Sequence, residues 1–191
     1  QEEHQWSFIP PRAGSLPAVR QAGWSQSPLD HHVLSRLEKR EVAPAPVADR
    51  RTLIRRVTFD LIGLPPASGE VQEFVTATAP DAYARHVDRL LASPRYGERW
   101  GRYWLDVARY ADSNGLDENL AYGNAWRYRD YVIGAWNADK PFDRFVTEQL
   151  AGDLLPPGTE SERREHMVAT GFLALGPKVL AEVDAKKMEM D

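Results

Sequence analysis

Cysteine is absent from this chain of 191 residues. Its absence excludes disulfide bonds, thiolate-ligated zinc, iron–sulfur clusters and covalently attached c-type haem within these residues, because each of them needs a cysteine sulfur. The compartment stays open, since a chain of this length can bury a core that needs no disulfide to be stable.

Long apolar runs and a strong excess of one charge are also missing. No apolar stretch approaches the roughly 18 residues of a membrane span, and the opening QEEHQWSF lacks the basic start and apolar centre of a signal peptide. The 24 basic and 28 acidic residues give a formal charge of −4, which argues against nucleic-acid or anionic-membrane binding. We therefore expect a cytosolic chain, or a mature or clipped piece of an exported protein.

Familiar catalytic and nucleotide-binding motifs do not occur. The sequence contains no H-E-x-x-H, G-x-S-x-G, P-loop or G-x-G-x-x-G pattern. The five histidines are scattered: His31 and His32 are neighbours on one predicted helix and cannot face one ligand together, and His86 and His166 border apolar stripes. We predict no catalytic residue and no cofactor-binding residue in this chain.

What the sequence does contain is helical periodicity, with apolar residues three and four positions apart and no strand-like alternation of useful length. Ser27 before Pro28 and Ser93 before Pro94 are typical helix starts, and Gly63 is a typical helix end. The predicted helices span about 27–40, 49–62, 69–77, 81–93, 93–113, 125–140, 141–156 and 161–176.

The predicted fold class is therefore all-α, a single irregular domain of about eight helices over residues 27–176. Residues 1–26 are rich in proline and predict an extended arm that packs on this domain. Residues 177–191 form a C-terminal segment with no terminating signal.

A stretch rich in tryptophan and charge, RYWLDVARYADSNG, lies in the fifth predicted helix. Helical spacing places its large apolar residues on one face, which favours burial over a sugar-binding cleft. That face consists of Trp100, Trp104, Val107, Ala108 and Ala111. The predicted core aromatics are Trp100, Trp104, Trp126 and Trp136.

The charged residues of the same stretch stand three apart and predict an ion network with the following helix. Its expected members are Asp106, Arg109, Asp112, Arg127, Arg129 and Asp130. We expect Arg109 to pair with Asp106, Asp112 or Asp130 and so to orient the loop 112–124. Acid/base chemistry by Asp106 and Asp112 on a glycosidic bond stays open as an alternative, because the sequence does not give the separation of the two carboxyl groups.

A loop of oxygen-bearing side chains follows, comprising Asp112, Asn114, Asp117 and Asn119. Calcium accepts such ligands, but Gly115 falls at position four instead of six and no glutamate closes the set as in an EF-hand. Any tight turn prefers the same residue types. We predict no metal site, with this loop as the one candidate.

Several long blocks resemble one family, the domain of unknown function that follows the cytochrome-c-like module in large secreted proteins of planctomycetes and related bacteria. The blocks are QWSFIPP, DRRTLIRRVTFDLIGLPP, YARHVDRLLASPRYGERWGRYWLDVARYADSNG, AWRYRDYVIGAWNADKPFDRFVTEQLAGDLLP and ATGFLALGP. They cover almost the whole chain in order.

The resemblance implies a periplasmic or secreted multidomain protein, with a haem module before this domain and another domain after it. Family members usually continue into a C-x-x-C-H haem-attachment motif, which has no counterpart at any position here. The resemblance thus implies a c-type haem outside these residues, a truncation after residue 191, and neighbouring domains as partners. It also suggests a redox or polysaccharide partner.

Three hypotheses follow. The leading one is a non-catalytic helical scaffold or docking domain of an extracytoplasmic cytochrome c-like protein. The second is a fragment of a polysaccharide-acting enzyme with carboxylates in an aromatic cleft. The third is a carbohydrate- or calcium-binding module. Buried tryptophans and closed ion pairs favour the first, and exposed tryptophans beside converging carboxylates favour the others.

Overall fold

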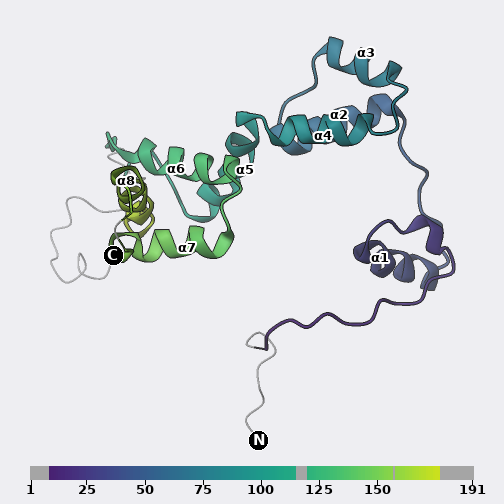
Figure 1. The fold of residues 1–191 in the computed structure, drawn as a ribbon, viewed down its shortest axis with the longest axis horizontal. Coiled ribbons are helices and arrows are strands. Elements are labelled where there is room, and N and C mark those ends of the chain that lie inside the picture. Colours follow the sequence, from purple (N-terminus) through teal and green to yellow (C-terminus); the bar gives the residue numbers. More distant parts are fainter. Residues whose placement is uncertain (1–8, 115–119, 157, 177–191) are drawn as a thin grey trace, which may run out of the picture. The chain divides into compact units, whose positions relative to one another are not determined.

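The computed structural model describes residues 9–114, 120–156 and 158–176, and its regular structure is helical. These ranges contain eight α-helices with short 3-10 turns, and an isolated antiparallel bridge between Ser113 and Ala121 (Figure 1). The predicted all-α class and the number of helices are confirmed. None of the helices described is long and apolar enough to cross a membrane.

The chain divides into two units, residues 1–48 and 49–191. In the first unit, α1 (Pro28–Lys39) begins at the predicted Ser27, whose hydroxyl and backbone N–H form a reciprocal capping box with Asp30. The backbone N–H of Arg20 donates to the Glu38 carboxylate over 2.9 Å. The chain at Arg20 is thus bonded to α1, and the division falls after residue 48, where prolines interrupt the helices.

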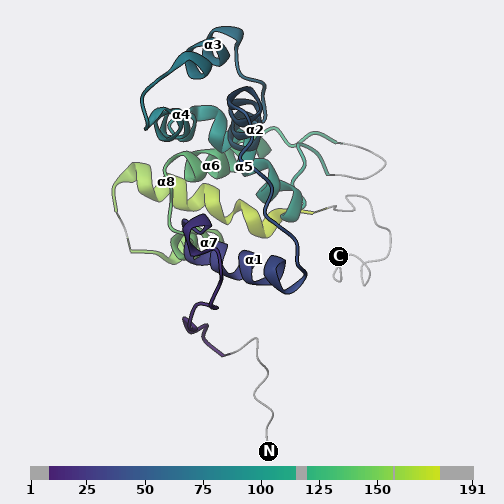
Figure 2. The ribbon, with the colours of Figure 1, turned by 90° about the vertical axis from the view of Figure 1, so that its right-hand side faces the viewer.

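The second unit begins with α2 (Arg50–Ile62), α3 (Ser68–Thr76) and α4 (Ala82–Leu91), which contact one another (Figure 2). Ile54, Phe74 and Ala82 form their shared core. Arg50 donates to the carbonyl of Phe74 and lies 4.5 Å from the centre of its ring. The helices therefore pack through a small apolar core that an arginine covers.

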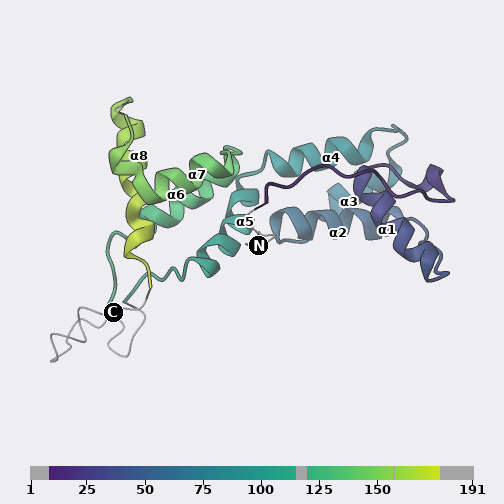
Figure 3. The same ribbon diagram turned by 90° about the horizontal axis from the view of Figure 1, so that it is seen from below.

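The larger core lies among α5 (Pro94–Val107), α6 (Ala125–Asn137), α7 (Phe142–Ala151) and α8 (Glu160–Ala169), with 3-10 turns at Gly152–Leu154 and Thr170–Ala174. Figure 3 shows α6, α7 and α8 gathered together. The buried face of α6 follows helical spacing. The core comprises Tyr128, Tyr131, Val132, Ala135, Phe145 and Ala169.

A close contact between backbones joins α5 to α6. Gly97 and Gly101 are buried one turn apart on α5 and face Ile133 and its neighbours on α6. The backbone N–H of Gly97 donates to the Asn137 side-chain oxygen over 2.8 Å, and the Asn137 amide donates to the Pro94 carbonyl over 3.1 Å. Glycine is required at position 97 because the backbone of α6 lies too close for a side chain there.

α5 ends at Val107, seven residues before the stop predicted at Asn114. The chain turns at Arg109, whose φ of 59° lies in the left-handed region. The N–H of Tyr110 donates to the Leu105 carbonyl over 2.9 Å, which satisfies a group that the helix leaves unpaired. Val107 is consequently 77% exposed and Ala111 lies beyond the helix, so the predicted apolar face is wrong at both positions.

We predict opposite effects for two glycine-to-alanine substitutions. The Cβ of Gly97→Ala would lie 2.4 Å from the Ile133 carbonyl oxygen, a backbone atom that cannot move without shifting α6. We expect a loss of about 1–3 kcal/mol in the free energy of unfolding, measured by urea denaturation. Gly134→Ala on α6 is the control, because its Cβ meets nothing within 4 Å. It should stabilise by about 0.5–1 kcal/mol, since alanine favours helix, and equal effects of the two changes would contradict the close contact.

Candidate functional site

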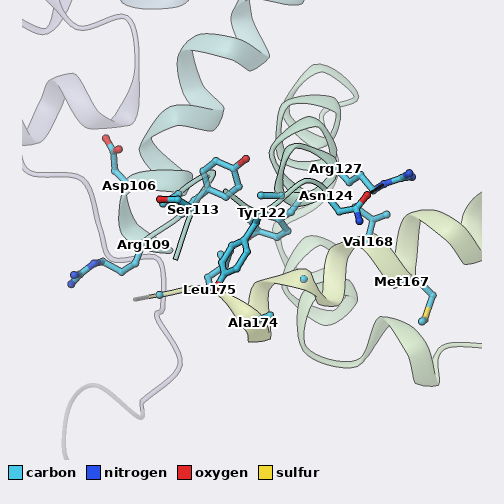
Figure 4. Close-up of a pocket in the computed structure, with 16 residues that line it drawn as sticks. Asp106, Arg109, Ser113, Tyr122, Asn124, Arg127, Met167, Val168, Ala174 and Leu175 are labelled. Atoms are coloured by element: carbon cyan, nitrogen blue, oxygen red, sulfur yellow. Dashed lines mark hydrogen bonds between the residues drawn. The ribbon is translucent and has the colours of Figure 1, made fainter. Parts of the chain in front are cut away.

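A cleft of about 860 Å³ lies in the second unit. Its walls come from the end of α5, the segment after it, the start of α6, and α8 with the 3-10 turn that follows (Figure 4). Three tyrosines and two arginines line it with apolar side chains of α8 and the turn. The residues that carry the argument are Arg109, Tyr110, Tyr122, Arg127, Tyr128 and Val168.

The turn at Arg109 places Tyr110 in the cleft wall. The Tyr110 ring stacks on Tyr128 with centroids 6.2 Å apart, and its hydroxyl donates to Asp112 over 2.5 Å. Burial, together with the bond to the Asp112 carboxylate, raises the pKa of Tyr110. The phenol therefore stays protonated and serves as a hydrogen-bond donor.

The loop that begins at Asp112, the candidate for metal binding, has hydrogen bonds between its two ends. The Asn114 side-chain oxygen accepts from the N–H of Leu120 over 3.0 Å, and the Tyr122 N–H donates to the Asp112 carbonyl over 2.8 Å. Two of the proposed ligands, Asp117 and Asn119, lie outside the described residues. Within the part of the chain that is described, no three histidines or carboxylates gather as a metal site would require.

The charged residues of the predicted ion network form exposed pairs, and Arg129 joins two of its expected carboxylates. Asp106 lies 3.8 Å from Arg102 on its own helix, and Arg129 lies 3.7 Å from Asp112 and 3.2 Å from Asp130. These side chains are more than one third exposed, so each pair contributes about 1 kcal/mol or less.

The two remaining members of the predicted network lie on the cleft. Arg127 donates to the Asn124 side-chain oxygen over 3.1 Å and stacks on Trp126. The guanidinium of Arg109 forms no ion pair with any residue that the structure describes. Sequence spacing suggested a partner for Arg109 because it assumed a continuous helix, and the turn removes that spacing.

Hydrogen bonds join the buried side chains behind Tyr128, which lines the cleft. The Trp104 indole N–H lies 2.9 Å from the Tyr128 hydroxyl and 3.0 Å from the side-chain oxygen of buried Gln149, to which the Tyr128 hydroxyl also donates. The Gln149 amide donates to the Phe145 carbonyl over 3.0 Å. Burial raises the pKa of Tyr128 to about 12. These groups hold the wall in place and have no proton to exchange near neutral pH.

The tryptophans divide between core and surface. Trp104 and Trp136 pack against the large core, and Trp100 is partly buried among Tyr96, Tyr103 and Trp136. Trp126, expected in the core, is 44% exposed. It stands roughly 200° around the α6 axis from Tyr128, on the face away from the core.

A buried charge cluster was not predicted from the sequence. Glu148 on α7 is fully buried and accepts hydrogen bonds from Tyr131 over 2.9 Å and from Arg144 over 2.7 Å. Lys140 also donates to Glu148, and its ammonium lies 2.6 Å from Glu165. The one sequence signal is that Glu148 stands three residues after Phe145, on the apolar face of α7.

The haem expected from the family resemblance has no site of covalent attachment in this chain, which contains no cysteine. Two histidines near the cores are already engaged. Thr58 gives its hydroxyl proton to the Ile54 carbonyl, so it accepts from His86 Nε2 over 3.2 Å, and His86 Nδ1 accepts from Arg89 over 3.1 Å. Burial, then the charge of Arg89, lowers the pKa of His86. His166 Nε2 lies 3.5 Å from Glu148.

These features define a helical domain with an aromatic, arginine-rimmed cleft and a hydrogen-bonded interior. The chain belongs to the PSCyt2 family, described as a protein of unknown function (DUF1549), whose profile matches residues 28–191. Comparison with curated proteins and with solved structures gives no match. The resemblance to a domain of unknown function is thus confirmed at the level of the family.

Substitutions at Arg109 test the strained turn. Arg109→Gly should stabilise the protein by about 0.5–1 kcal/mol, because glycine adopts the left-handed conformation without a Cβ clash. Arg109→Val should destabilise it, since a β-branched residue resists this conformation. Thermal unfolding measures both. Arg102→Gly inside α5 is the control and should cost about 1 kcal/mol, and stabilisation by both glycines would contradict the assignment.

Glu148→Gln tests the buried cluster. It leaves the Lys140 ammonium, which is 10% exposed, without its buried counter-charge, so we expect a loss of about 3–5 kcal/mol at pH 7. Although burial opposes it, hydrogen bonding by Lys140, Arg144 and Tyr131 holds the pKa of Glu148 below its usual 4.5. Its stabilising effect is therefore present above pH 4.5 and lost as the pH falls through the lowered pKa.

The measurement is the free energy of unfolding from pH 7 down to the acid transition. The variant should lose less stability than the parent on acidification below pH 4.5. Glu160→Gln, which removes an exposed carboxylate paired with Arg164, is the matched control and should change little. Parallel pH profiles for parent and Glu148→Gln would show that Glu148 is not the titrating group.

Proposed function

We propose that this chain is a non-catalytic docking domain of an extracytoplasmic multidomain protein whose c-type haem lies outside these residues. The cleft would receive a segment of a neighbouring module of the same protein. The observation that carries the proposal is the pairing of an open aromatic cleft with a buried cluster, Trp104, Tyr128 and Gln149, whose polar groups are bonded to one another. Membership of the PSCyt2 family is consistent with it.

The lining of the cleft is suited to a protein partner. Tyrosine and arginine are enriched at protein interfaces, where they combine large contact area with directional hydrogen bonds. Val168 and Leu175 contribute apolar side chains to the lining, and Arg109 and Arg127 contribute positive charge. The expected partner segment therefore places an apolar side chain in the cleft and carboxylates beside it.

The enzyme alternative has less support from the arrangement of the carboxylates. Asp106 lines the cleft, whereas Asp112 does not and is bonded to Tyr110 and paired with Arg129. Glycoside hydrolysis needs two carboxyl groups that face one bond from opposite sides. A docking role requires only the shape and charge of the cleft.

The test is a titration of the 15N-labelled chain with the haem-containing module that the family resemblance implies, followed by amide NMR. We expect the largest perturbations at Tyr122, Arg127 and Val168. The double change Arg109→Glu with Arg127→Glu should weaken binding about tenfold or more, chiefly because it opposes a complementary charge. Arg85→Glu, at a 63% exposed arginine on α4, is the matched control.

Two results would contradict the proposal. One is binding that perturbs residues away from the cleft and ignores the double change. The other is polysaccharide hydrolysis by the chain that Asp106→Asn abolishes, which would favour the enzyme alternative.

A further inference from the structure

A second pocket, of about 460 Å³, lies where α6 turns into α7. It shares no lining residue with the cleft. Four aromatic rings from three helices surround it, with one carboxylate and one lysine at its edge. The lining comprises Trp104, Trp136, Phe142, Phe145, Asp139 and Lys140, with Ala135 and Pro141 between them.

The planes of neighbouring rings are steeply inclined to one another. Trp104 and Phe142 have centroids 6.2 Å apart and planes at 78°, and Trp104 and Phe145 have centroids 4.9 Å apart and planes at 71°. Aromatic rings attract compact cations to their faces, and here rings inclined to one another line one pocket. The Trp104 N–H is bonded to Gln149 and Tyr128, so the orientation of its ring is fixed.

The charge balance at the pocket is negative. The Lys140 ammonium is 10% exposed and lies between the carboxylates of Glu148 and Glu165, so its charge is already compensated. Asp139 is exposed and forms no ion pair with the residues that the structure describes. An aromatic pocket with a carboxylate at its rim favours a positively charged ligand.

Helix geometry holds Asp139 in place. Its φ of 47° lies in the left-handed region, just after the end of α6. The N–H of Asp139 donates to the Trp136 carbonyl over 3.2 Å, and the N–H of Lys140 donates to the Ala135 carbonyl over 2.9 Å. Pro141 then fixes its own φ and restricts the backbone of Lys140 before it. A residue other than glycine in this conformation is strained, and such strain is concentrated at functional positions.

We propose that this pocket binds a small organic ammonium ligand. Its methylated ammonium group lies against the crossed rings of Trp104 and Phe142, and Asp139 supplies the counter-charge at the rim. The pocket volume is within the range of small-molecule sites, roughly 300–1,000 Å³.

Calorimetry and indole NMR with two probes test the ligand class. Choline carries the quaternary ammonium group, and 3,3-dimethylbutan-1-ol has the same shape without the charge. Choline should bind and shift the indole signals of Trp104 and Trp136. The uncharged probe should bind about tenfold more weakly, because it lacks both the cation–π attraction and the attraction to Asp139.

Two variants separate charge from shape. Asp139→Asn keeps the size and the left-handed conformation, and should weaken choline binding about fivefold to tenfold without affecting the uncharged probe. Phe142→Leu, at a side chain 70% exposed and so tolerant of change, replaces an aromatic face with an apolar one. It should weaken choline binding about twofold to fivefold. Asp88→Asn on α4 removes the same charge elsewhere and should have no effect.

Unfolding curves establish that the variants are folded, so a loss of binding is interpretable. Equal binding of the two probes would overturn the proposal, as would no binding of choline at about 100 mM. Preferential binding of cellobiose with the same indole shifts would also overturn it, and would assign the pocket to sugars.

Discussion

The close approach of α5 and α6 is the contact on which the packing of helices α5 to α8 depends. Gly97 lets the two backbones meet, and Asn137 ties the first turn of α5 to the last turn of α6 with two hydrogen bonds. This contact sets which face of α6 meets α5. The cleft beside Tyr128 and the pocket beside Trp136 both follow, because both residues are carried by α6.

Polar groups inside the protein act as structural cross-links. Gln149 joins Trp104 to Tyr128, and Glu148 joins Tyr131, Lys140 and Arg144, so α7 is bonded to α5 and α6 through side chains. A buried polar group is costly unless it is bonded, and in these two clusters each group finds partners. Because their polar groups are bonded to one another, these two clusters offer no free acid or base for catalysis. The proposed binding functions therefore rest on the exposed residues of the cleft and of the aromatic pocket.

Both candidate sites lie beside a helix end made by a strained residue. Arg109 ends α5 at the cleft and Asp139 ends α6 at the aromatic pocket, each with positive φ and each charged. Glycine would be the less strained choice at such a position. A charged side chain there is held at a fixed point of the surface by the helix that it terminates, which suits recognition of an oppositely charged group.

The sequence by itself determined the helices, their starts at Ser27, Asp49 and Ser93, and the family, because caps and apolar spacing are local signals. Only the tertiary structure decided that α5 stops at Val107, that Trp126 is exposed and that Glu148 is buried. The left-handed turn at Arg109 could not be predicted from the sequence, because no glycine stands at that position. The burial of Glu148 depends on Lys140 and on Tyr131 of the preceding helix. Such outcomes depend on contacts between elements, which no local pattern of residues contains.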